Sequence, residues 1–333
     1  MSETGSSFQL EVLRRLDSDE TAAVTLLVER ATEADGVRPL SEHVSLHLRY
    51  GGDEGVRHLL LYGDGRGEKP HLAGYAHLDL SDPVSGASAE LVVDPAWRRQ
   101  RIGRTLLKAV QREAPDGRLR LWAHGEHSAA GRLAASMGFT ASRELWQMRR
   151  SLFAPLPRAE LPEGVHIRHF VPGADDEAWV ALNARAFVGH PEQGALTLDD
   201  LHRRMAEPWF DAPGFFLAER DADHSASRLV GFHWTKVHGG NDHTQHHDDL
   251  EQHEPGRHGH EPIGEVYVLG VDPSEQGKGL GKALTLIGLH HLRSLGLRDV
   301  MLYVEAENQA AIALYERLGF THWDNDVMFT SGH

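Results

Sequence analysis

The sequence of 333 residues contains no cysteine, no long hydrophobic run and no excess of positive charge. Without cysteine the chain can form no disulfide, no thiolate metal site and no cysteine nucleophile. No apolar run approaches the ~20 residues that a membrane-spanning helix requires. The polar, acidic N-terminus also lacks the basic and apolar regions of a signal peptide. We therefore expect a cytoplasmic protein with no membrane partner.

The charge balance narrows the range of partners further. The formal net charge is -15 at pH 7. Nucleic-acid binding depends on clustered Lys and Arg that contact phosphates, so we expect no nucleic-acid partner. A local cluster of hydrogen-bond donors can still bind a polyanionic small molecule. Hydrophobic residues make up 40% and charged residues 25% of the chain, as in soluble globular proteins, and the length suits two domains of about 150 residues.

The chain has the pattern of two copies of one α/β domain. The tripeptide Val93-Asp94-Pro95 recurs as Val271-Asp272-Pro273. In each copy there follow basic residues and glycine, a helix, a strand, a second helix and a Gly-Phe pair. Between the copies, residues 154–162 carry three prolines and predict a linker. We therefore expect an N-terminal domain over 1–153 and a C-terminal domain over 163–333.

Short apolar runs predict the strands, and helical spacing predicts two helices over 280–295 and 308–318, with Asn308 as N-cap of the second. The expected strands are 58–62, 72–80, 89–93, 119–123, 165–170, 215–219, 229–236, 265–271 and 300–304. A histidine-rich tract over 238–260 predicts a solvated loop between two strands. Its histidine spacing matches no defined zinc site, so we expect no metal.

The segment Gln276-Gly277-Lys278-Gly279-Leu280-Gly281-Lys282 follows an apolar strand and begins a helix. Glycine allows a tight turn and a close approach of ligand to backbone N–H groups. The free N–H groups and the dipole of a helix start favour phosphate, and the two lysines add positive charge. The segment matches neither the dinucleotide-binding nor the P-loop glycine pattern. It therefore predicts a pyrophosphate-binding turn of another kind.

Two motifs in the second half resemble the GNAT superfamily of acetyl-CoA-dependent acetyltransferases. One is Gln-x-x-Gly-x-Gly directly after Val271-Asp272-Pro273, and the other runs from Asn308-x-x-Ala311-x-x-Leu314-Tyr315 to Gly319-Phe320. The resemblance implies an α/β fold of two tandem GNAT domains, each a mixed, splayed central sheet flanked by helices. It also implies acetyl-CoA as co-substrate, held between the strand that ends at Val271 and the strand after it.

The resemblance further implies which residues contact acetyl-CoA. In the second domain these are Leu269, Gly270, Val271, Gln276, Gly277, Lys278, Gly279, Leu280, Gly281, Lys282, Asn308, Gln309, Ala310, Ala311, Ile312 and Ala313. In the first domain the matching positions are Leu91, Val92, Val93, Arg99, Gln100, Arg101, Ile102, Gly103 and Arg104. There Arg101 has a Cβ where the family has glycine, which could crowd the pyrophosphate.

Acetyl transfer to an amine requires a base, a donor for the oxyanion and an acid for the departing thiolate. The family resemblance implies Glu265 as the base, often through water, and Tyr315 as the acid. The alternatives are a solvated strand-end carboxylate for Glu265 and a packed aromatic for Tyr315. We expect the backbone N–H of Leu269 or Gly270 to stabilise the oxyanion.

Nearly the whole chain resembles one tandem GNAT family, the mycothiol synthases. Segments that carry this resemblance include 189–194, Pro208-Trp209-Phe210-Asp211 and the strand over 264–273. The family acetylates the cysteinyl amine of 1D-myo-inositol 2-(L-cysteinylamino)-2-deoxy-alpha-D-glucopyranoside, a thiol-bearing pseudodisaccharide. The resemblance implies five substrate contacts, at Glu42, Glu192, Lys236, Glu265 and Tyr303, and we expect a monomer.

Three other functions remain open at this stage. The chain could acetylate another small amine, such as an aminoglycoside or a polyamine, or it could acetylate protein N-termini. It could also be a non-catalytic sensor that binds acyl-CoA in both halves. Within the repeat, Glu265 aligns with Ala87 and Tyr315 with Ala134, so the first half lacks both catalytic groups. We therefore expect the first domain to be non-catalytic.

Overall fold

A computed structural model describes residues 8–51, 55–63, 70–82, 86–114, 117–125, 128–222, 225–239 and 261–331. These form two compact units, and neither is one continuous stretch of sequence. The first unit comprises residues 1–146, 305–307 and 324–333, and the second comprises 147–304 and 308–323. The proline-containing segment 154–162 is neither helix nor strand. Among the described residues, no helix is long and apolar enough to cross a membrane.

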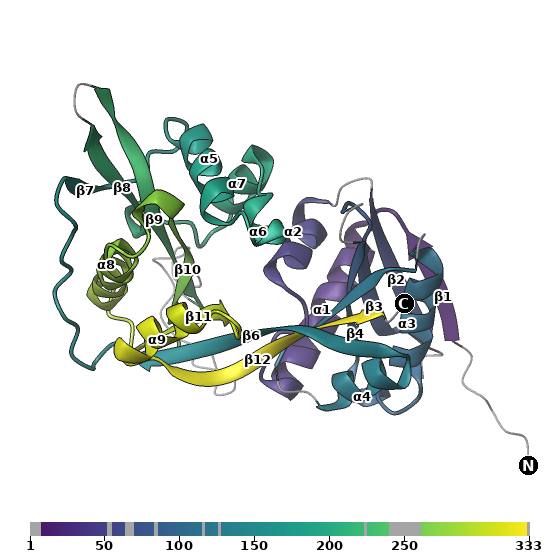
Figure 1. The fold of residues 1–333 in the computed structure, drawn as a ribbon. Helices are drawn as coiled ribbons and strands as arrows, with labels where there is room; N and C mark the ends of the chain where they lie inside the picture. The colour runs from purple at the N-terminus through teal and green to yellow at the C-terminus, as the bar shows by residue number, and fades with distance from the viewer. Residues whose placement is uncertain are drawn as a thin grey trace, which may run out of the picture. The chain divides into compact units, whose positions relative to one another are not determined.

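The first unit is a mixed sheet with helices on both faces (Figure 1). Its strands are, in sheet order, β1 (Phe8–Leu13), β2 (Val56–Gly63), β3 (His71–Asp79), β4 (Ala87–Val93) and β5 (Leu119–Ala123), followed by the larger parts of β12 (Thr321–Ser331) and β6 (Phe139–Ser151). Helices α1 (Ser18–Asp35) and α2 (Glu42–Tyr50) bury Leu27 and Val44 against Tyr75 of one face. Helix α3 (Ile102–Glu113) buries Leu106 on the other face, and α4 (Ser128–Ser136) follows β5.

The second unit repeats this three-layer arrangement. Its strands are, in sheet order, β11 (Asp299–Glu305), β10 (Ile263–Val271), β9 (Ser225–His238), β8 (Phe215–Ala222) and β7 (Val165–His169). Helices α5 (Asp176–Ala186) and α7 (Leu198–Met205) cover one face with Trp179 and Leu201, and α6 (Pro191–Gly194) lies between them in sequence. Helix α8 (Leu280–Ser294) covers the other face with Leu280 and Leu284, and α9 (Gln309–Arg317) follows β11. The predicted tandem α/β architecture is confirmed.

Each sheet opens at its parallel strand pair. Strands β10 and β11 pair over three residues only, from Gly264 with Val300 to Val266 with Leu302. The remaining described residues of both strands, through Val271 and Glu305, have no partner in this register. Strands β4 and β5 likewise pair only over Ala87–Ala89. The predicted splay is therefore present in both units, and it leaves backbone groups on the separated segments available to a ligand.

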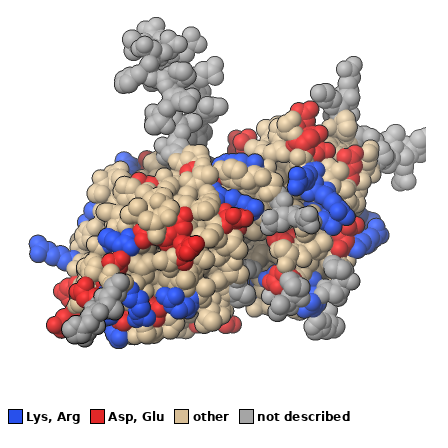
Figure 2. Space-filling model, turned by 90° about the horizontal axis from the view of Figure 1, so that it is seen from above, with Lys and Arg blue, Asp and Glu red and all other residues tan. Residues whose placement is uncertain are grey.

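All nine predicted strands are present, and the two predicted helices end within a residue of the expected positions. Strands β1, β6 and β12 were not predicted. Most of the histidine-rich tract, residues 240–260, lies outside the described residues. On the face drawn in Figure 2, acidic and basic side chains are interspersed among other residues.

Candidate active site

The predicted pyrophosphate turn begins with a short 3-10 turn after β10, Pro273–Glu275, which Asp272 caps. The Asp272 carboxylate accepts hydrogen bonds from the backbone N–H of Ser274 at 3.1 Å and from Arg185 Nε at 3.0 Å. Gly277 and Gly279 follow with φ of 76° and 88°, the left-handed region that favours glycine. This backbone path turns the chain sharply into α8.

The start of α8 fits a phosphate group. Gly279 precedes the helix and supplies no side-chain cap, so the first N–H groups point outward without a side-chain acceptor. A Cβ placed on Gly277 or Gly279 would meet no atom within 4 Å, which shows that the space over the turn is open. Lys278 Nζ lies 3.1 Å from Glu275, so its charge is shared with a carboxylate. The charge of Lys278 is therefore partly neutralised before any anion binds, while the backbone N–H groups stay available to one.

The other predicted acetyl-CoA contacts lie where β10 leaves β11. Leu269, Gly270 and Val271 occupy the unpaired end of β10. Gly270 packs so closely on Phe232 that a Cβ would lie 2.5 Å from that ring, so its glycine has a packing reason. Asn308 caps α9 as predicted, and its side-chain oxygen accepts the N–H of Ala311 at 3.1 Å. Helix α9 thus begins at Gln309, shortly after the unpaired end of β11 at Glu305.

Glu265 lies on β10 inside the protein, with 7% of its surface exposed. Its Oε2 atom is 2.6 Å from Nε2 of His238, which ends the neighbouring strand β9. Burial raises the pKa of Glu265, but the His238 hydrogen bond and the charges of His238 and Lys236 outweigh it, so the net pKa lies below the ordinary value. The alternative of a solvated strand-end carboxylate is wrong, because the group is buried and ionised.

Lys236 lies directly opposite Glu265 in the sheet register and is buried as well. Its Nζ atom lies 4.4 Å from the ring centre of Trp209 and 5.0 Å from that of Tyr267. Such cation–π contacts stabilise a charged ammonium away from bulk water. Tyr267 in turn accepts a hydrogen bond from Arg204 Nε of α7 at 2.8 Å. The result is a buried group of alternating charges and aromatic rings on the α7 side of the sheet.

A β-bulge in β10 lies within this group. Val266 pairs with Thr235 and Val268 with Trp234, so Tyr267 is an extra residue between two consecutive residues of β9. A bulge disrupts the ladder locally and redirects the side chains on either side of it. Here the consecutive residues Tyr267 and Val268 both pack in the cluster around Trp234, on the side of the sheet where Tyr267 also lies close to Lys236.

Tyr315 is buried on α9, with its ring 5.7 Å from that of Phe320. Burial raises the pKa of Tyr315 to about 12. Its hydroxyl makes no hydrogen bond within the described part of the chain. The side chain is thus a packed aromatic whose polar atom is protonated at neutral pH, so both interpretations of its role remain compatible with its position.

The other three predicted substrate contacts are Tyr303, Glu42 and Glu192. Tyr303 on β11 is 41% exposed, and its hydroxyl accepts a hydrogen bond from Gln147 Nε2 at 2.7 Å. Glu42 is the first residue of α2 in the first unit, after the N-cap Ser41. Glu192 lies in α6, but its side chain is outside the described atoms. Within the described ranges, no group of three or more His, Asp or Glu side chains could hold a metal ion.

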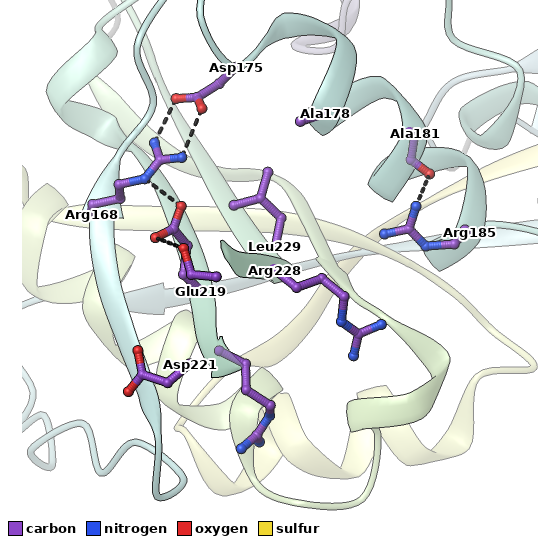
Figure 3. A pocket seen from close by; sticks show the side chains of 11 residues that line it. Arg168, Asp175, Ala178, Ala181, Arg185, Glu219, Asp221, Arg228 and Leu229 are labelled. Atoms are coloured by element: carbon purple, nitrogen blue, oxygen red, sulfur yellow. Dashed lines mark hydrogen bonds and ion pairs between the residues drawn. The ribbon is translucent and has the colours of Figure 1, made fainter. Parts of the chain in front are cut away.

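A pocket of about 660 Å³ lies elsewhere in the second unit, between α5 and strands β7, β8 and β9 (Figure 3). None of the predicted site residues lines it. Figure 3 shows Arg168 bridging Asp175 and Glu219, at 2.6 and 2.8 Å. Arg185 of the same wall binds Asp272, at the base of the pyrophosphate turn. We interpret this wall as an ion-pair network that holds the turn in place.

The first unit repeats the turn but not the functional groups, and the sheet register corrects one alignment. The sequence paired Glu265 with Ala87, which is wrong by one residue. Ser88 pairs with Asp79 on β3 as Glu265 pairs with Lys236 on β9, and the pairing to the parallel strand shows the same correspondence. The β3–β4 pairing lacks the bulge, so a constant sequence offset shifts the alignment. The first unit still has no carboxylate at this position.

Comparison with known proteins agrees with this fold. The model of the acetyltransferase (GNAT) family matches residues 177–320, and that of an acetyltransferase (GNAT) domain matches residues 57–141. A tandem GNAT protein from the clavulanic acid biosynthesis pathway superposes with a TM-score of 0.64 at 19% identity, covering 98% of this chain and 99% of that one. A GCN5-related N-acetyltransferase from Sphaerobacter thermophilus gives 0.64 at 24% identity, covering 97% and 95%. Fold and turn together define a tandem GNAT acetyltransferase.

Closer relatives are found among proteins of known family. The mycothiol acetyltransferase of Streptosporangium roseum is 58% identical, covering 95% of this chain and 97% of the relative. That of Acidothermus cellulolyticus is 57% identical, covering 98% and 96%. The chain belongs to the mycothiol acetyltransferase family, which confirms the resemblance seen in the sequence. It is an acetyl-CoA-dependent N-acetyltransferase.

Proposed function

We propose that this chain transfers the acetyl group of acetyl-CoA to the cysteinyl amine of 1D-myo-inositol 2-(L-cysteinylamino)-2-deoxy-alpha-D-glucopyranoside, giving mycothiol and CoA. The observation that carries the proposal is near full-length identity of 57–58% to mycothiol acetyltransferases. The buried, ionised Glu265 beside the point where β10 leaves β11 supports a reaction on a cationic amine.

Acetyl-CoA supplies the acetyl thioester when bound. The turn over 276–282 would hold the pyrophosphate through its backbone N–H groups, and 269–271 and 308–313 would line the remainder of the cofactor. The open space over Gly277 and Gly279 supports this. In the first domain, 91–93 and 99–104 would hold a second acetyl-CoA, because Arg99 and Arg101 keep the left-handed turn.

The catalytic roles in this proposal come from the family resemblance. It assigns proton removal from the amine to Glu265, which is buried and ionised, and the α-amine is a weak base with a reference pKa of about 7.7–8.0. Tyr315, protonated at neutral pH, would donate a proton to the departing thiolate. The N–H of Leu269 or Gly270 would stabilise the oxyanion. Glu42, Glu192, Lys236 and Tyr303 would bind the polar substrate.

The domain assignment completes the proposal. Residues 163–333 would carry catalysis, and residues 1–153, joined through 154–162, would be non-catalytic. Ser88 and Ala134 stand in the first domain where the second has Glu265 and Tyr315. We further propose a cytoplasmic monomer that acts on a small molecule and binds no nucleic acid.

A substrate panel tests the proposal. The protein is incubated with acetyl-CoA and each candidate amine, and CoA release and product mass are followed. We expect CoA release and a mass gain of one acetyl group with the cysteinyl pseudodisaccharide, and none with aminoglycosides, polyamines or peptides. CoA release with one of those amines in place of the pseudodisaccharide would refute the proposed substrate. Absence of release with every amine, together with acyl-CoA binding, would indicate a sensor.

A further inference from the structure

His238 and Glu265 form a pair in which only the histidine is accessible. Their Nε2 and Oε2 atoms lie 2.6 Å apart, and the His238 side chain is 35% exposed against 9% for Glu265. A proton acceptor must reach the substrate amine directly or through one water. The accessible member of this pair is therefore better placed to do so than the buried carboxylate.

The hydrogen bond also fixes the state of the ring. Glu265 is ionised at neutral pH, because its pKa lies below the ordinary value. An ionised carboxylate only accepts hydrogen bonds, so Nε2 of His238 must donate. In a neutral imidazole the lone pair then lies on Nδ1. In the part of the chain that the structure describes, Nδ1 has no hydrogen-bond partner, so the basic nitrogen is the one turned away from Glu265.

Charged groups from several elements surround the pair. Glu265 on β10 contributes a negative charge in direct contact with the ring. Lys236, two residues earlier on β9, carries a positive charge, which the Trp209 and Tyr267 rings also stabilise. Arg204 of α7 reaches the Tyr267 hydroxyl, and Glu261, shortly before β10, pairs with Arg298. The carboxylate is the only one of these groups bonded to the imidazole.

We propose that His238 is the general base of the reaction and that Glu265 is its positioning partner. Nδ1 takes one proton from the substrate ammonium, and Glu265 stabilises the imidazolium through Nε2–H. The free amine then forms the new C–N bond as the C–S bond to CoA breaks. The second proton that the amine nitrogen loses is matched by the proton that the CoA thiolate gains to become a thiol. The proton on His238 passes to solvent, so each turnover releases one proton. Glu265 does not itself have to be the base.

This inference rests on the proposed function for its substrate, but its test applies to any amine that the protein acetylates. The variants are His238→Gln and His238→Ala. The matched control is His202→Gln, because His202 forms a similar bond with Asp176 at 2.8 Å, is also partly exposed and lies on α7. Steady-state kcat and KM for the amine are measured from pH 5 to 9, and His238→Ala is assayed again with added imidazole.

We expect His238→Gln to lower kcat about 10²–10⁴-fold, the usual contribution of a general base. The acid limb of the wild-type kcat profile should disappear, because kcat reports the base in the enzyme–substrate complex. Imidazole should restore part of the activity of His238→Ala, and His202→Gln should behave as wild type. An unchanged acid limb in His238→Gln, or activity close to wild type, would overturn the proposal. So would a loss in His238→Ala that imidazole does not restore. A wild-type protein inactive on the pseudodisaccharide but active on another amine refutes only the proposed substrate.

Discussion

The two units build the same left-handed turn from different residues. In the second unit the positions with positive φ are Gly277 and Gly279, and in the first they are Arg99 and Arg101, at 67° and 65°. These two arginines are the only non-glycine residues with positive φ in the described parts of the chain. For such a residue this conformation costs about 1–2 kcal/mol. The surrounding fold therefore imposes the turn even where the sequence no longer favours it.

The same contrast is present at the base of the turn. Asp94 accepts hydrogen bonds from the backbone N–H of Ala96 at 2.9 Å and from Arg30 at 3.0 Å. Asp272 does the same with Ser274 and Arg185. The scaffold that aims the helix start is thus retained in both copies. What differs is the set of side chains between the separated strands.

In the first unit a buried ionic group lies at the strand separation. Glu90 occupies the register position of Val268, and its Oε2 atom lies 3.5 Å from Nε2 of His124, which Asp326 contacts at 2.9 Å on the other side. Burial lowers the pKa of His124, but hydrogen bonds and charges from Asp326 and Glu90 outweigh it and raise the pKa to about 10. The first unit thus has a paired charge, Glu90, at this register position, whereas the second unit has the apolar Val268 there.

The largest expected effect tests whether catalysis belongs to one copy only. Tyr315→Phe should lower kcat about 10²–10⁴-fold, because the phenol is the proposed acid. Its stability should change little, since the hydroxyl has no hydrogen-bond partner among the described residues and its removal leaves no donor or acceptor unpaired. The control is Tyr62→Phe, on β2 of the first unit, which should retain kcat. Steady-state kinetics and thermal unfolding are measured for both variants. Equal kcat values for Tyr315→Phe and Tyr62→Phe would contradict the proposal that only the second domain is catalytic.

The second test concerns stability in the first unit. His124→Gln leaves Glu90 and Asp326 without their cation, and loss of one partner from a buried ion pair costs about 3–5 kcal/mol. Because the pKa of His124 in the folded protein (about 10) exceeds its ordinary value of 6.5, this stabilisation is complete below pH 6.5 and disappears as the pH rises through 10. Denaturant unfolding at pH 6 and pH 10.5 should show a large difference from wild type that shrinks at the higher pH.

A suitable control for that measurement is His166→Gln, because His166 pairs with Glu219 at 3.0 Å on an exposed part of the second unit. Exposed pairs contribute about 0–1 kcal/mol. If both histidine variants lose the same unfolding free energy, the buried ion pairs of His124 stabilise the fold no more than an exposed pair does.

The sequence was sufficient to predict features that depend on local pattern. Alternating apolar runs located the strands, the glycines located the turn, and Asn308 located the start of α9 by its capping side chain. The carboxylate at Glu265 was found through family resemblance to a motif. Each of these signals lies within one segment of sequence and needs no knowledge of the neighbouring strand.

Features that depend on the pairing of distant segments were missed. The bulge at Tyr267 is a one-residue difference that becomes visible only against the partner residues Thr235 and Trp234. The bond between His238 and Glu265 depends on that register, and so does the cation–π contact that Trp209 makes with Lys236. Strands β6 and β12 have mixed polar patterns, because many of their residues are only partly buried.

The smallest expected effect separates backbone strain from ligand contact at the turn. Gly279→Ala and Gly296→Ala lie at the two ends of α8, both with positive φ and both with open space around a new Cβ. Each should lose about 1–2 kcal/mol of unfolding free energy. Only Gly279→Ala should also raise KM for acetyl-CoA, about 5–30-fold if the crowding costs a similar 1–2 kcal/mol. Arg101→Gly, the reverse change in the first unit, should leave kcat unaltered. Because strain is matched between the two alanine variants, a KM increase shared by Gly296→Ala would mean that the turn acts only through the stability of α8.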